Sequence, residues 1–71
     1  MKKYKSAMRR ALHRFNYAKR LHCLNAVISA MDCMHGIRMV AMGDDQVSYE
    51  DFAKMVKIYD AMFNKMQEIW N

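Results

Sequence analysis

Proline is absent from the sequence, and glycine and cysteine each occur only twice among its 71 residues. Without proline, no position forces a break in a helix. Two cysteines are too few for a miniprotein that disulfides hold together. Long apolar runs are also lacking, so we expect neither a secretory signal nor a membrane-spanning helix. These absences leave a small helical domain that depends on its own core.

Catalytic patterns are missing as well. His13, His22 and His35 have no serine, cysteine or carboxylate at a spacing that suggests a triad. Two glycines cannot build a glycine-rich phosphate loop. A chain of this length forms one small domain, residues 1–71, and buries only about 60% of its unfolded surface. We therefore expect no enzymatic activity and no cofactor.

The two cysteines have histidines near them, in the segments 22–23 and 33–35. On one continuous helix Cys23 and Cys33 would lie about 15 Å apart, too far for a single tetrahedral zinc site. We predict no metal site. We interpret the two thiols as reduced, which is typical of an intracellular, cytoplasmic protein.

What the sequence does contain favours helices. Its 71 residues include nine methionines and are 54% hydrophobic. Methionine, alanine, leucine, lysine and arginine, the residues that dominate, are all good helix formers. No segment shows the strict alternation of polar and apolar residues that marks a strand. We predict an all-α fold.

A break between two helices is predicted at residues 43–48. Gly43 can take the left-handed conformation that ends a helix. Ser48 can cap the next helix, with Asp51 completing a variant of the capping box. From Tyr49 onward, apolar residues recur at helical spacing through three heptads.

These signals predict an antiparallel helical hairpin of about residues 21–42 and 49–70, because a short connection makes neighbouring helices antiparallel. The hairpin accounts for residues 21–70. Gly36 lies inside its first helix, and we interpret this glycine as a position that allows close packing.

Charge is concentrated at the start of the chain. Residues 1–20 hold eight lysines and arginines and no acid, whereas residues 21–71 hold four basic and seven acidic residues. The net charge is thus +8 in the first segment and −3 in the second. We predict a basic amphipathic helix over about 4–20. It is either continuous with the next helix or folded back as a third helix, with a bend between about 16 and 25.

The basic side chains share one face of this helix, opposite an apolar stripe. A rod with a continuous basic face suits a phosphate backbone, so we predict that the protein binds RNA or DNA. Tyr4 and Tyr17 could stack on unpaired bases. The expected main contacts are Arg9, Arg10, Arg14 and Arg20, and the expected electrostatic fringe is Lys2, Lys3 and Lys5.

An alternative is a protein-binding inhibitor or adaptor that lays the same helix on an acidic surface of a larger protein. The residues that would then carry the affinity are Tyr4, Met8, Leu12 and Phe15. If the helix projects from the hairpin, this stripe lacks a partner within the chain, and we expect a homodimer. The working hypothesis is a small regulatory protein that binds nucleic acid and has no membrane partner.

Overall fold

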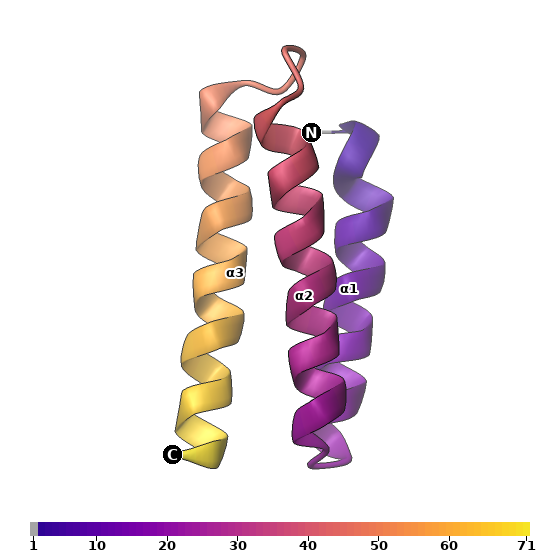
Figure 1. Cartoon of the computed structure of the whole chain (residues 1–71), viewed down its shortest axis with the longest axis vertical. Coiled ribbons are helices and arrows are strands. Elements are labelled where there is room, and N and C mark those ends of the chain that lie inside the picture. Colours follow the sequence, from indigo (N-terminus) through magenta and orange to yellow (C-terminus); the bar gives the residue numbers. More distant parts are fainter. Residues whose placement is uncertain (1) are drawn as a thin grey trace.

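The computed structural model describes residues 2–71, except for the side chain of Lys2. In this range the chain forms three helices and no strand: α1 (Lys2–Arg20), α2 (Leu24–Met42) and α3 (Tyr49–Trp70). The helices alternate in direction, so α1 and α3 run the same way with α2 antiparallel to both (Figure 1). The predicted all-α fold and its hairpin of α2 and α3 are confirmed.

Residues 21–23 reverse the chain between α1 and α2, so α1 folds back as a third helix. His22 has a φ of 54°, the left-handed conformation that commonly ends helices. The N–H of Cys23 donates to the Ala18 carbonyl at 3.1 Å, and that of His22 to the Lys19 carbonyl at 3.0 Å. These two bonds form a Schellman motif, which satisfies the last carbonyls of α1. The sequence left two other arrangements of α1 open, a projecting arm and a helix continuous with α2. The structure excludes both.

The core lies mainly along α2, which packs against both other helices, while α1 and α3 contact each other only weakly. Val27, Met34 and Met55 are fully buried. The buried apolar side chains are Tyr4, Met8, Ala11, Phe15, Ala18, Val27, Ala30, Met31, Met34, Ala41, Met55 and Met62. Five of these belong to α1, so the apolar stripe of the basic helix is part of the core.

α3 begins as predicted, because the Ser48 hydroxyl oxygen accepts a hydrogen bond from the backbone N–H of Asp51 at 3.1 Å. At its other end the Trp70 ring stacks on His22, with centroids 4.7 Å apart. Gly43 differs from the prediction: its φ is −92°, not left-handed, and its N–H bonds to the final turn of α2. That helix ends through tight local bonds that any residue could make.

Gly36 does not have the packing role expected from the sequence. A Cβ placed on Gly36 would meet no atom within 4 Å, and the residue is exposed. The helix therefore contains a glycine that no neighbouring side chain requires.

No helix within residues 2–71 is both long enough and apolar enough to cross a membrane.

Candidate nucleic-acid interface

The outward face of α1 gathers four basic side chains around one shallow hollow. Arg9, Arg10, His13 and Arg14 line this hollow, which has a volume of about 430 Å³. All four are exposed. Arg9 and His13, and likewise Arg10 and Arg14, are four residues apart, so each pair lies on one side of the helix, and the two pairs are adjacent around it. We call this set the arginine hollow.

An exposed aromatic ring lies next to the arginine hollow. Tyr17 is 48% exposed and lines a second hollow of about 310 Å³ that shares His13 and Arg14 with the first. The Arg20 guanidinium lies 5.9 Å from the Tyr17 ring centroid. Cations that suit phosphate thus adjoin a ring that suits a stacked base.

The arginines differ in how firmly they are held. Arg14 donates to Ser29 Oγ at 3.3 Å and to Cys33 Sγ at 3.0 Å, both on α2. Arg10 donates to Ser6 Oγ at 3.3 Å. Within the described residues, Arg9 makes no hydrogen bond or ion pair. Arg14 is therefore fixed against the fold, whereas Arg9 can turn its guanidinium fully to a ligand.

The predicted lysine fringe does not form one group. Lys3 forms an ion pair with Asp44, at 3.0 Å from Nζ to Oδ2. The hydrogen bond to Asp44 raises the pKa of Lys3, and the carboxylate offsets its charge. Lys5 borders a separate groove between α1 and α3. The side chain of Lys2 lies outside the described residues.

Asp44, in the turn between α2 and α3, holds the first turn of α1. Its Oδ2 accepts hydrogen bonds from the Tyr4 hydroxyl at 2.7 Å and from Lys3 at 3.0 Å, and its Oδ1 accepts one from the Gln46 N–H at 2.9 Å. These bonds, the one from Tyr4 foremost, lower the pKa of Asp44 to about 2. A carboxylate that stays ionised thus sits beside the start of α1, where it offsets the positive charge of Lys3.

Three of the four residues in the stripe assigned to the protein-binding alternative are buried in this fold. Tyr4, Met8 and Phe15 are 9%, 4% and 3% exposed, and they pack in the core that α1 shares with α2. The stripe would lack a partner in the chain only if α1 projected, and it does not project, because residues 21–23 reverse the chain so that α2 packs against the stripe. Tyr4 is also excluded as a stacking residue. Only Leu12 of the four keeps substantial exposed surface.

The cysteines and histidines do not converge. Both thiols are free, Cys23 exposed and Cys33 half-buried. In the described part of the chain, no group of three or more His, Cys, Asp or Glu residues is placed to hold a metal ion.

Sequence reasoning missed the groove between α1 and α3, which combines side chains that are far apart in the chain. Its lining includes Lys54 and Lys65 of α3, which carried no signal of a site. The sequence shows that these residues are charged, but it does not show that they lie opposite α1, because that position depends on α1 folding back.

Neither the sequence nor the fold has a significant match among known protein families, curated proteins or solved structures.

Proposed function

We propose that this protein binds the phosphate backbone of a nucleic acid, RNA or DNA, through the outward face of α1. The arginine hollow carries the proposal, because three arginines and a histidine line one exposed hollow on a segment without acids. A guanidinium binds phosphate through two parallel N–H groups. No refolding is needed, because the apolar side of α1 is already packed in the core.

An unpaired segment suits this surface better than a continuous duplex. Tyr17 lies beside the arginine hollow with about half of its surface exposed. Stacking on an aromatic ring stabilises an unpaired base by about 1–3 kcal/mol, whereas the faces of paired bases are covered by their neighbours. Phosphates at Arg9 and Arg10 would therefore be accompanied by a base on Tyr17.

The salt dependence of binding tests the phosphate contacts. A labelled single-stranded oligonucleotide is titrated with the wild type and with Arg9→Gln/Arg10→Gln, and anisotropy is recorded over a range of salt concentrations. Removal of two phosphate contacts should lower the slope of log affinity against log salt by roughly 1.4. Arg14 is not substituted, because its hydrogen bonds to α2 stabilise the fold.

The matched control removes two charges from α3. Lys54→Gln/Lys57→Gln has the same net charge as the arginine variant, and both lysines are exposed. It should leave the slope within experimental error of the wild type. Equal losses in the two variants would show a general charge effect and refute the assigned face, as would undetectable binding by the wild type.

Stacking is tested separately with Tyr17→Ala. We expect this variant to bind a single strand at least about fivefold more weakly than the wild type does. Its affinity for a blunt duplex should equal that of the wild type. Tyr49→Ala is the control, because Tyr49 is 85% exposed on another helix. A Tyr17→Ala variant that binds single strands normally would contradict the stacking role.

A cytoplasmic location is part of the same proposal, supported by the two free thiols, which suit a reducing compartment. The regulatory role stays a prediction. Dimerisation stays a prediction, but its original reason is gone because the stripe of α1 is buried. The apolar side chains left for a dimer contact include Ile28, Met39 and Val40 of α2, which are 42%, 47% and 64% exposed. Sedimentation at several concentrations tests it.

A further inference from the structure

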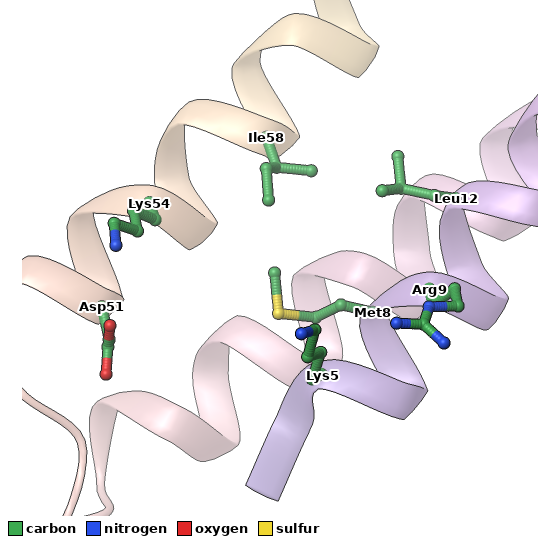
Figure 2. Close-up of a pocket in the computed structure, with 7 residues that line it drawn as sticks. All are labelled: Lys5, Met8, Arg9, Leu12, Asp51, Lys54 and Ile58. Carbon is green, nitrogen blue, oxygen red and sulfur yellow. The ribbon is translucent and has the colours of Figure 1, made fainter. Parts of the chain in front are cut away.

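A groove with an apolar floor runs between α1 and α3. Its upper part, of about 590 Å³, is lined by seven residues of the two helices (Figure 2). Its lower part, of about 310 Å³, shares Leu12 and Ile58 with the upper part, so the two are continuous. Figure 2 shows Met8, Leu12 and Ile58 directed into the space between the helices.

The groove follows from the way the three helices pack. α1 and α3 both pack on α2 but contact each other only weakly, and they run in the same direction (Figure 1). The apolar side chains at the middle of the gap are therefore only partly covered. Met8 and Met62 form its floor, while Leu12 and Ile58 are half-buried at its middle. A fourth helix in this position would complete a four-helix arrangement.

The rims of the groove are basic. Lys5, Arg9 and Lys19 border it on α1, and Lys54 and Lys65 border it on α3. Lys65 is partly offset by Glu68, at 3.2 Å. Among the described residues, Lys5, Lys19 and Lys54 form no ion pair.

Carboxylates are scarce along the same rims. Of the described residues that line either part of the groove, Asp51 is the only acid. The floor therefore suits an apolar ligand surface, and the rims suit a negatively charged ligand surface.

We propose that this groove binds an acidic amphipathic helix of a partner protein. The apolar face of such a helix would cover Leu12 and Ile58, and carboxylates on its flanks would meet the lysines on both rims. The stretch of α1 from Lys5 to Lys19 is about 21 Å long, which matches about 14 residues of a bound helix.

The lining disfavours other occupants. A nucleic-acid backbone offers no aliphatic surface for a floor of methionine, leucine and isoleucine. A second copy docked groove to groove would bring two sets of basic rims together, and this repulsion is costly. The proposal does not depend on the nucleic-acid proposal, since among the described residues only Arg9 borders both the groove and the arginine hollow.

Methionine methyl groups report directly on the groove. The full chain, labelled with ¹³C at its methionine methyls, is titrated with a synthetic helical peptide that carries leucines on one face and glutamates on both flanks. The signals of Met8 and Met62 should shift, whereas those of Met39 and Met42, exposed on α2, should not. No shift at Met8 and Met62, or larger shifts at Met39 and Met42, would overturn the proposal.

Two exposed lysines three residues apart give a matched pair of variants. Lys54 borders the groove, whereas Lys57 lines none of the hollows described above. Lys54→Glu should weaken binding of the acidic peptide about fivefold, and Lys57→Glu should leave it within about twofold. Equal effects of the two substitutions would mean that only net charge matters, which contradicts a site in the groove.

Three further titrations separate the possible occupants. The same peptide with lysine in place of glutamate should not bind, and equal binding would refute the charge preference. Shifts of Met8 and Met62 caused by protein concentration alone would show that a second copy covers the groove, and the proposal would fail. The same shifts caused by an oligonucleotide would assign the groove to nucleic acid and would also overturn it.

Discussion

Replacement of Phe15 by alanine tests the main structural result, that the apolar stripe of α1 is core and not a free binding surface. Phe15 is 3% exposed and belongs to the buried cluster. Phenylalanine-to-alanine changes in cores cost about 3–5 kcal/mol in the free energy of unfolding. Phe15 also borders the lower part of the groove, where water can enter the space that the ring leaves. We therefore expect a value near the lower limit, about 3 kcal/mol.

A loss of this size is a large share of the total for so small a protein. A domain of 71 residues has a free energy of unfolding of roughly 4–11 kcal/mol. At about 4 °C or more per kcal/mol, the variant should melt at least about 12 °C below the wild type. The melting temperature is measured by circular dichroism at 222 nm, and urea unfolding gives the free energy.

Tyr17→Ala is the matched control, since Tyr17 lies two residues further along α1 on the outward face and is 48% exposed. It should change stability by no more than about 0.5 kcal/mol. If Phe15→Ala costs less than about 1 kcal/mol, or if both variants cost the same, α1 does not pack on α2 as described.

Three further substitutions test single features. Gly36→Ala should stabilise the protein by about 0.5–1 kcal/mol in urea unfolding, because its Cβ meets open space inside a helix; destabilisation would show a packing role. Ser48→Ala should lower the free energy of unfolding by about 1 kcal/mol in the same assay, because the N–H of Asp51 loses its acceptor. An unchanged free energy of unfolding would contradict the capping role of Ser48. Asp44 has its pKa lowered to about 2, so its stabilisation is present above about pH 4 and disappears as pH falls through 2. The gap in melting temperature between wild type and Asp44→Asn should therefore narrow from pH 5 to pH 2, and a constant gap would contradict the role of the carboxylate.

Local signals in the sequence predicted the second half of the chain well. The bounds predicted for α3, 49–70, agree with the structure, and the cap by Ser48 is confirmed. Both depend on hydrogen bonds and apolar spacing within a few residues, which neighbouring sequence determines. Gly43 and Gly36 were misjudged for the opposite reason, because the role of a glycine depends on its backbone angles and on what lies beside it.

The candidate site was predictable in part. The arginines of α1 could be assigned to one face from their spacing alone, and the structure leaves Arg9, Arg10 and Arg14 on the outward face as expected. The pairing of Lys3 with Asp44 was not predictable, since the two residues are 41 positions apart. It depends on where the turn after α2 meets the first turn of α1.

By itself, the sequence determined that this protein is helical, that its helices break near residue 43, and that positive charge gathers on one face of its first helix. These properties follow from propensity, spacing and charge along the chain. Only the tertiary structure decided that α1 folds back, because that reversal depends on His22 in a left-handed conformation and on the apolar surface that α2 offers. The same reversal buries the stripe from Tyr4 to Phe15, and it creates the groove that neither helix has alone.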